Sequence, residues 1–405
     1  MTRTSRFSRM AGVRMLKQRI ATQLDRSGRI PFFQPHMGVN GAVIDLGHGP
    51  LVNFSSYNYL GLCGHPEISA AAKAAIDRYG TSVSASRIVS GEIPLHRELE
   101  QELADFLGSE DCLVFVGGYN TNVTTIGHLY GRRDLILYDE QSHNSIVSGT
   151  LMSGAERKRF RHNDVPALER QLREHRKEYG RVLVVVEGLY SMHGDVPDLA
   201  HLSEVCHRFD ADLMMDEAHS LGTLGATGRG LIEHCGLSGH PVDIHMGTLS
   251  KTLASCGGFI AGDTCLVEYL RFLAPGFIFS VGLPPADAAA ALAALRILRR
   301  EPERVIRLQA VGKEFRRLMH AAGFPVELDG VSPIVPLLIG EQYRCMEVSH
   351  ELQKRGINVQ PVIYPAVPKN GSLLRFFLCA DHTRQQLEFV VEQLLAVLAG
   401  TTATS

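Results

Sequence analysis

The chain has 405 residues, of which 45% are hydrophobic, and its formal net charge at pH 7 is -2. The length exceeds a comfortable single core and predicts a large domain with a smaller partner, while the near-neutral charge argues against nucleic acid as a partner. No apolar stretch approaches the ~20 residues of a membrane-spanning helix, and the eight cysteines lack the close pairs of a zinc site or a disulfide framework. We therefore expect a cytoplasmic small-molecule enzyme with no membrane span and with buried, reduced thiols.

The first 30 residues are strongly basic, and their single acid is Asp25. Such a balance suits an organelle transit peptide. However, apolar residues recur there at helical spacing: Val13, Leu16, Ile20 and Leu24. This favours a basic amphipathic arm that packs on a neighbouring subunit or on the large domain. We therefore predict an N-terminal helical arm over residues 1–49.

A strand-like passage at residues 41–54 is followed by alternating helix-like and strand-like segments up to about residue 280. That alternation predicts a mainly parallel sheet. A helix is expected over residues 96–108. Short apolar runs that end in glycine or an acid mark the expected strands: 112–118, 134–140, 181–188, 212–217 and 257–262.

The C-terminal part begins with an Ala/Leu-rich segment at residue 283 that predicts a long helix. Two apolar runs, 334–340 and 372–380, follow in a more mixed region. We therefore predict an α/β fold, with a large domain over residues 50–282 and a smaller α+β domain over residues 283–405.

Reactive side chains follow two successive strand-like segments. Asp216 and His219 close one apolar run, and Lys251 closes the next. Alone, such an acid would more often cap a helix and such a lysine would be solvated. Together, at strand ends where ligands gather, they supply the amine that holds an aldehyde cofactor and the anion that keeps its ring nitrogen protonated. The set predicts a pyridoxal phosphate site.

Residues suited to the rest of that cofactor occur at similar places. Gly117, Gly118 and Tyr119 follow a predicted strand and precede a predicted helix, whose N-terminal amides suit a phosphate. Thr248 adds a hydroxyl close to the lysine, and His143 follows another strand end, where an imidazole can stack on the ring. A glycine pair or a lone histidine more often marks an ordinary turn or cap, so these two signals are weak by themselves.

Eight motifs occur in the order found in the α-oxoamine synthases, at residues 53–62, 80–91, 142–146, 187–195, 215–222, 247–258, 277–285 and 375–383. The sequence resembles this family from about residue 50 to its end. The family includes serine palmitoyltransferase, 5-aminolevulinate synthase, 8-amino-7-oxononanoate synthase and 2-amino-3-ketobutyrate ligase. The resemblance implies a fold type I, aminotransferase-like architecture and dependence on pyridoxal 5'-phosphate.

The resemblance also implies roles around the cofactor ring. Lys251 holds the cofactor as a Schiff base and then serves as the base. Asp216 pairs with the ring nitrogen, so that electrons from the α-carbon of the substrate can flow into the ring. His219 and Ser191 hydrogen-bond the ring oxygen, and His143 stacks on the ring.

Further residues are implied to bind the phosphate and the substrate. Thr248, Gly118 and Tyr119 hold the phosphate, together with Ser280 from the second subunit of a homodimer with shared active sites. Arg375 binds the carboxylate of the amino acid through its planar guanidinium group. As a strand residue, it could instead be an ordinary surface arginine.

The implied reaction is an acyl transfer to carbon. A small amino acid (serine, alanine or glycine) condenses with an acyl thioester of coenzyme A or of an acyl carrier protein. Loss of the thiol and of carbon dioxide then gives an α-amino ketone. The amino acid, the acyl chain length and the thiol carrier stay open.

The chain departs from the family pattern at two positions. Tyr57 stands where many members have an asparagine that helps to hold the substrate carboxylate, and this version resembles serine palmitoyltransferases and relatives beside polyketide pathways. His193 stands where an acid is usual, and the sequence offers no physical account of that change. Together the two changes favour a long-chain or carrier-bound acyl donor.

Two other functions are compatible with the cofactor. An aminotransferase shares the fold but loses no carbon dioxide, and the ordered motifs argue against it. A non-catalytic partner subunit of a heterodimeric synthase has no need for an amine, so the presence of Lys251 argues against that role. A hydrolase is disfavoured because no Gly-x-Ser-x-Gly elbow occurs.

Overall fold

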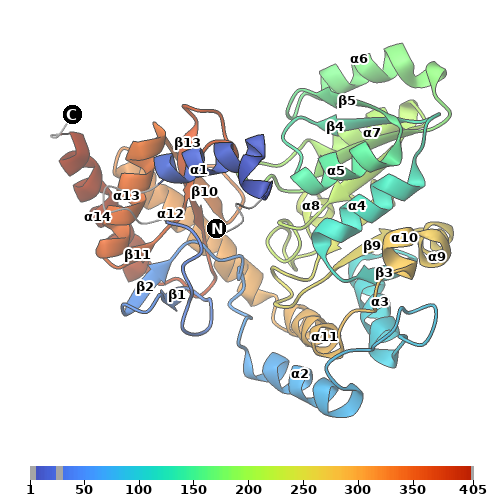
Figure 1. Cartoon of the computed structure of the whole chain (residues 1–405), viewed down its shortest axis with the longest axis horizontal. Helices are drawn as coiled ribbons and strands as arrows, with labels where there is room; N and C mark the ends of the chain where they lie inside the picture. The colour runs from blue at the N-terminus through green and yellow to red at the C-terminus, as the bar shows by residue number, and fades with distance from the viewer. Residues whose placement is uncertain (1–5, 24–30, 403–405) are drawn as a thin grey trace.

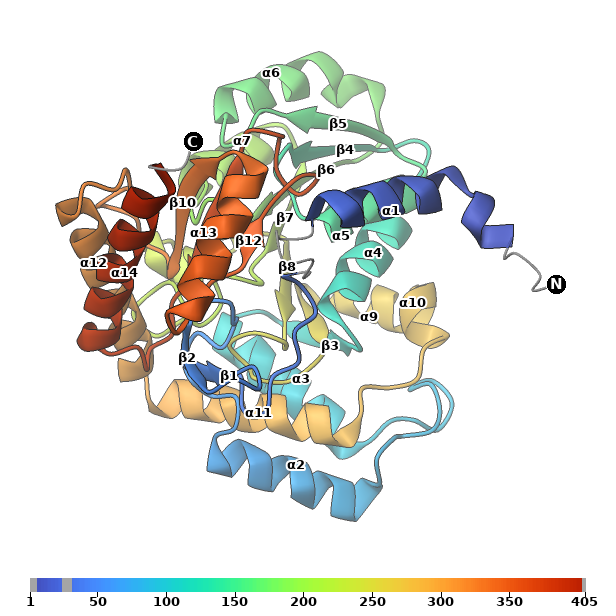
Figure 2. The same cartoon turned by 60° about the vertical axis from the view of Figure 1, so that its left-hand side comes forward.

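The computed structural model describes residues 6–23 and 31–402. Its elements form a larger α/β part and a smaller α+β part, which stand side by side in Figure 1. Helices α2 (Pro66–Tyr79) and α11 (Pro285–Arg300) pack on each other below the larger part (Figures 1 and 2). Helix α11 then leads into α12 (Glu303–Ala321) of the smaller part.

In the described residues, the larger part contains a seven-stranded sheet in the order β3-β9-β8-β7-β6-β4-β5. The strands are β3 (Asp111–Phe115), β4 (Leu135–Asp139), β5 (Glu156–Phe160), β6 (Val182–Glu187), β7 (Asp212–Asp216), β8 (Ile244–Thr248) and β9 (Gly258–Gly262). Neighbouring strands in the order β8-β7-β6-β4-β5 pair in parallel, and β9 is antiparallel to both of its neighbours, β3 and β8. The predicted mainly parallel sheet is confirmed, although the edge strand β5 was not among the predicted strands.

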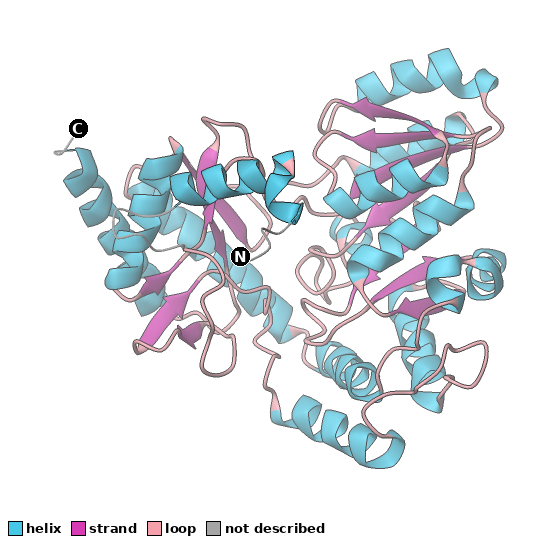
Figure 3. Ribbon diagram, viewed as in Figure 1, coloured by secondary structure: helices cyan, strands magenta, loops and turns pink. Residues whose placement is uncertain are grey.

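Helices cover both faces of this sheet (Figure 3). Alternate strand residues belong to two separate apolar clusters, because successive side chains point to opposite faces. One face packs against α4 (Gly118–Leu129), α5 (Asn144–Ser153), α9 (Thr264–Leu273) and α10 (Pro275–Ile278). The other packs against α3 (Pro94–Leu107), α6 (Val165–His175), α7 (Leu199–Arg208) and α8 (Leu231–His234).

The smaller part contains two three-stranded sheets, β10-β13-β12 and β1-β2-β11. Their strands are β1 (Val43–Asp45), β2 (Pro50–Asn53), β10 (Ile334–Gly340), β11 (Ile357–Asn358), β12 (Pro361–Val362) and β13 (Ser372–Phe377). Helices α12, α13 (Gln342–Lys354) and α14 (Arg384–Thr402) accompany them. The two apolar runs predicted in this region therefore form β10 and β13.

The predicted boundary at residue 50 separates two strands that pair with each other. β1 is antiparallel to β2, and β2 pairs in parallel with β11 near the C-terminal end. Residues 43–53 thus share a sheet with the C-terminal part, a long-range pairing that local patterns do not show. The remaining division of the chain into domains stays a prediction.

The basic N-terminal segment contains a short 3₁₀ turn (Arg6–Arg9) and helix α1 (Ala11–Gln23). Val13 and Ile20 are half-buried and Leu16 is exposed, while Leu24 lies outside the described residues. Helix α1 covers only part of the arm predicted over residues 1–49, and β1 lies near its end, so the arm as a whole stays a prediction. What the arm packs against stays a prediction.

The cysteines differ in part from expectation. All eight are free, but Cys63, Cys235, Cys256 and Cys265 are exposed, so the prediction that all are buried is wrong. A cysteine in a loop or a first helical turn follows no apolar periodicity, so its burial could not be read from the pattern. Within the described residues, no helix is both long and apolar enough to cross a membrane.

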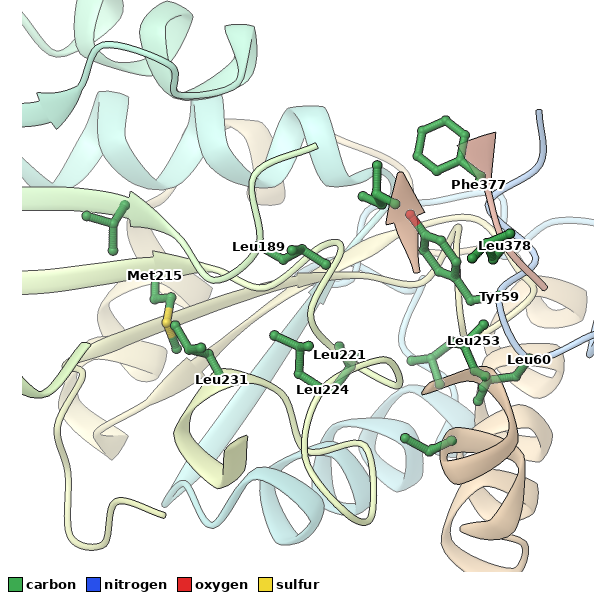
Figure 4. Packing of buried hydrophobic residues seen from close by; sticks show 14 of the residues in the cluster. Tyr59, Leu60, Leu189, Met215, Leu221, Leu224, Leu231, Leu253, Phe377 and Leu378 are labelled. Atoms are coloured by element: carbon green, nitrogen blue, oxygen red, sulfur yellow. The ribbon is translucent and has the colours of Figure 1, made fainter. Parts of the chain in front are cut away.

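The two parts meet through buried apolar side chains. Figure 4 shows Tyr59 and Leu60, from the loop after β2, beside Leu253 of the larger part and beside Phe377 and Leu378 at the end of β13. Because one contiguous cluster joins both parts, the loop after β8 is held against β13. That junction lies beside the candidate site.

Candidate active site

A cavity of about 370 Å³ lies where the parallel strands end. β6, β7 and β8 end there at Glu187, Asp216 and Thr248. Ten of the residues predicted for the site line this cavity: Tyr57, Gly118, Tyr119, His143, Ser191, Asp216, His219, Thr248, Lys251 and Arg375. Ser280 does not, and its predicted place in the site of a second subunit stays a prediction.

Asp216 is a buried carboxylate at the end of β7. Its Oδ1 accepts a hydrogen bond from the amide of Ala218 at 2.9 Å, and its Oδ2 accepts one from Nδ2 of Asn122 at 2.7 Å. Among the described residues, no cationic side chain is ion-paired with it. A buried charge without a cation is costly, so this carboxylate suits a positively charged group in the cavity.

Lys251 follows β8 in a tight turn, in which the amide of Ala254 donates to the carbonyl of Lys251 at 3.0 Å. Its Nζ lies 5.5 Å from the centroid of the Tyr57 ring. Burial lowers the pKa of Lys251 below its ordinary value, while the negative charges of Asp216 and Glu187 oppose that shift. The lysine is therefore uncharged at lower pH than a surface lysine, which an amine nucleophile requires.

His219 is buried, and its Nδ1 lies 2.7 Å from the hydroxyl oxygen of Tyr59. Burial, followed by the charge of Lys251, lowers the pKa of His219 well below its ordinary value. Burial likewise raises the pKa of Tyr59 well above its ordinary value. If the Tyr59 hydroxyl donates to Nδ1, the neutral ring carries its proton on Nε2, where it can donate a hydrogen bond.

His143 caps the N-terminus of α5, and its backbone amide donates to Glu187 Oε1 at 2.6 Å. Its Nδ1 lies 2.7 Å from the hydroxyl oxygen of Ser145. Burial lowers the pKa of His143 and raises that of Glu187 well above the ordinary carboxyl value. A neutral imidazole facing the cavity is suited to stacking on an aromatic ring.

The N-terminus of α4 closes one end of the cavity. A Cβ added at Gly118 would lie 2.9 Å from Oγ1 of Thr248, so a side chain there would displace the end of β8. The Thr248 hydroxyl in turn lies 2.7 Å from that of Ser250. Backbone amides of the first helical turn have no partner within the helix, so this end offers amides and hydroxyls to an anion.

Arg375 enters the cavity from β13 of the smaller part. One terminal nitrogen donates to the carbonyl of Ser191 at 2.8 Å, and the guanidinium lies over the Phe377 ring at 4.5 Å. Its Nε is buried and has no hydrogen-bond partner among the described residues. An orphaned donor beside a cavity suits a carboxylate ligand, and it argues against a surface role for this arginine.

The sequence patterns missed several residues that shape the site. Asn122, Glu187 and Ser250 line the cavity, and Tyr59 contacts His219. Glu187 ends a strongly apolar strand, a signal that could have singled it out. Asn122 lies inside α4, where nothing local separates it from any other polar helical residue.

These contacts fit pyridoxal phosphate. The unpaired carboxylate of Asp216 suits the protonated ring nitrogen, and the glycine-lined end of the cavity suits the phosphate. Lys251 supplies the amine, and the orphaned Nε of Arg375 suits the carboxylate of an amino acid. The donor set therefore matches both the cofactor and an amino-acid substrate.

Comparisons with known proteins agree with this chemistry. The family model described as aminotransferase class I and II matches residues 49–394. A serine palmitoyltransferase of Bacteroides thetaiotaomicron is 38% identical over 91% of this chain and 93% of its own length. An 8-amino-7-oxononanoate synthase of Treponema denticola is 37% identical over 84% of this chain and 86% of its own length.

A solved structure is similar over nearly the whole chain. That structure is described as SPT with the PLP internal aldimine. Its TM-score is 0.92 at 32% identity, and the match covers 98% of this chain and 99% of that one. The similarity confirms the fold type I, aminotransferase-like architecture. With the matches in sequence, it shows that the chain belongs to the class I and II aminotransferase family, within its α-oxoamine synthase branch.

Proposed function

We propose that the protein is a pyridoxal phosphate-dependent α-oxoamine synthase that joins a small amino acid to an acyl thioester, with loss of carbon dioxide. One observation supports this most: a lysine, an unpaired aspartate and an arginine with a free donor share one cavity. When bound, the cofactor supplies an aldehyde for the amine and an electron-poor ring that stabilises a carbanion at the α-carbon. The net reaction forms one carbon–carbon bond and releases carbon dioxide and a free thiol.

Three residues of the cavity have different roles in the proposed reaction. Lys251 Nζ would anchor the cofactor, and as a neutral amine in the same cavity it would accept the α-proton of the amino acid. Asp216 holds a proton on the ring nitrogen through its charge. Arg375 would hold the carboxylate of the amino acid and so determine which bond at the α-carbon breaks.

A second cavity supports the acyl part of the proposal. It has a volume of about 930 Å³ and shares His143, Ser191 and Met192 with the first. Apolar residues of the smaller part line it: Val326, Val335, Leu338, Val367 and Leu373. The cavity also has polar and charged lining residues, but these apolar side chains, in a cavity that adjoins the first, suit the acyl chain of the thioester.

Exposed apolar residues support the proposed homodimer. Ile88 is 52% exposed, Val89 78% and Phe279 84%. Their two segments adjoin, because the amide of Gly282 donates to the carbonyl of Ala85 at 3.1 Å. A clustered apolar surface of this kind is typical of a subunit interface, and Ser280 lies in it. We therefore propose that a second subunit receives Ser280, and that the enzyme works in the cytoplasm, where its free thiols persist.

Exchange of the α-proton in deuterated water tests the amino-acid half of the reaction. Glycine, alanine and serine are each incubated with the holoenzyme, and loss of the α-proton is followed by NMR. We expect fast exchange of one of the three. Adding acyl-coenzyme A or acyl carrier protein should then release carbon dioxide and free thiol in equal amounts. Formation of a keto acid without carbon dioxide would instead identify an aminotransferase.

Substitution of Leu338 by tryptophan tests the acyl cavity. Leu338 is 64% exposed on β10, so the change should leave the fold intact. The indole should occupy space needed by long chains and lower kcat/KM for a long-chain donor about tenfold or more relative to a short one. Leu395→Trp, on α14 and away from the cavity, is the matched control. Equal losses for short and long donors would contradict this assignment.

A further inference from the structure

His162 lies between two carboxylates in the turn from β5 to α6. Its Nδ1 is 2.9 Å from Oδ1 of Asp139, and its Nε2 is 2.8 Å from Oδ2 of Asp195. An ionised carboxylate only accepts hydrogen bonds, and a neutral imidazole carries one N–H. Both contacts are therefore satisfied together only when His162 is an imidazolium.

The two carboxylates belong to the loops that carry site residues. Asp139 ends β4, and its Oδ1 also accepts from the amide of Gln141 at 2.8 Å, in the loop that leads to His143. Asp195 closes the other loop, where the amide of Tyr190 donates to the carbonyl of Asp195 at 2.9 Å.

That second loop, residues 190–195, presents Ser191 to the site cavity. The carbonyl of Ser191 accepts the hydrogen bond from Arg375. Gly194 has a left-handed φ of 74°, and a Cβ there would lie 2.5 Å from the carbonyl oxygen of Ile334. The loop therefore fits closely against β10, and a shift of Asp195 would be passed on to Ser191 and Arg375.

Three further groups lie around His162, and among the described residues none of them is ion-paired with Asp139 or Asp195. Tyr190 lies edge-on at 4.6 Å and the exposed His193 at 6.2 Å between ring centroids, and Glu140 accepts from the backbone amide of His162. Asn163 supports the same pair, because its side-chain amide donates to Asp195 and its backbone amide donates to Asp139. Among the described residues, His162 is the cation that is ion-paired with these two carboxylates.

The balance of these effects favours the charged ring. Burial lowers the pKa of His162, but the hydrogen bonds and charges of Asp139 and Asp195 outweigh it and raise the pKa to about 9. Because Asp139 is fully buried, loss of the imidazolium would leave its charge without a cation.

We propose that His162 is a positioning residue for the reaction: as an imidazolium held by Asp139 and Asp195, it clamps the loop of His143 to the loop of Ser191. The inference rests on the proposed function for its consequence, since the second loop orients Arg375 toward the amino acid. His162 touches neither substrate nor cofactor. It acts by keeping two loops in register across the mouth of the cavity.

The clamp has a defined pH dependence. A histidine whose folded pKa is raised stabilises the folded state fully below its unfolded pKa of about 6.5, and that contribution is lost as the pH rises through the folded value. For His162 the loss is expected through about pH 9. The clamp is therefore closed at neutral pH and released in alkaline solution.

The test compares His162→Gln with wild type and with His320→Gln, an exposed histidine on α12. Glutamine can bond one carboxylate but carries no charge. The dissociation constant of the amino acid is measured by absorbance of the holoenzyme between pH 7 and pH 10. We expect binding about tenfold weaker in His162→Gln at pH 7, a loss typical of a misplaced binding group. The ratio to wild type should shrink toward one above about pH 9, while His320→Gln follows wild type throughout.

NMR of labelled histidine in the wild-type holoenzyme gives a readout independent of turnover. The His162 resonance should titrate near pH 9, and Asp195→Asn, which keeps the shape of the carboxylate, should lower that value. An ordinary histidine pKa, or a ratio of dissociation constants that does not change with pH, would overturn the proposal even if His162→Gln failed to fold. Because these readouts need no acyl donor, they remain decisive if the proposed condensation is not observed.

Discussion

Replacing Lys251 with alanine is expected to lower α-proton exchange about 10²- to 10⁴-fold, the loss expected when a positioned base is removed. Lys251 lines the cavity, and among the described residues its amine has no ion-pair partner that would hold it in the protonated form. The substitution therefore removes both the anchor of the cofactor and the acceptor of the proton. The measurement is exchange of the preferred amino acid in deuterated water, with bound cofactor quantified by absorbance.

Two controls separate chemistry from folding in that experiment. Lys73→Ala removes an exposed lysine on α2 and should leave exchange unchanged. A small primary amine such as methylamine, added to Lys251→Ala, should restore part of the exchange by occupying the space left by the side chain. Full exchange in Lys251→Ala without added amine would remove Lys251 from the mechanism.

Strand ends made much of the site predictable. β6 and the inner part of β7 are apolar and end in an acid, whereas β8 has the mixed sequence IHMGT. The pattern therefore singled out Asp216, while Thr248 was predicted from its closeness to Lys251 in the sequence. Parallel strands end at one edge of the sheet, which brings such residues together without any knowledge of the loops. Lys251 was predictable for the same reason, because it lies in the turn just beyond the end of β8 at Thr248.

Other features depend on contacts that no local pattern records. β5 has the sequence ERKRF, and of its side chains only Phe160 is buried; at the edge of the sheet the other residues face solvent, so the run lacks the apolar character expected of a strand. Asn122 and Tyr59 matter because they contact Asp216 and His219 across long stretches of chain. The place of Ser280 requires a second subunit, which a single sequence does not position.

Replacing Asp216 with asparagine should lower α-proton exchange about 10²- to 10³-fold, the range for loss of one preorganised electrostatic partner. The change removes the negative charge and keeps the shape, so the ring nitrogen loses the group that favours its protonated form. Oδ1 of Asn122 is buried and has no hydrogen-bond partner among the described residues. A flip of that amide can therefore accept from the new side chain, and the free energy of unfolding should change little.

Asp212→Asn is the matched control, since it makes the same change at the opposite end of β7. There the carboxylate accepts from the hydroxyl of Tyr130 at 2.6 Å, away from the residues that line the cavity. We expect the control to retain exchange, and we expect Asp216→Asn to bind the cofactor with an altered absorbance spectrum. Comparable losses in the two variants would mean that exchange responds to damage in β7 rather than to the charge at the ring nitrogen. A loss confined to Asp216→Asn would assign the protonated ring to that one carboxylate, because the two substitutions are otherwise chemically identical.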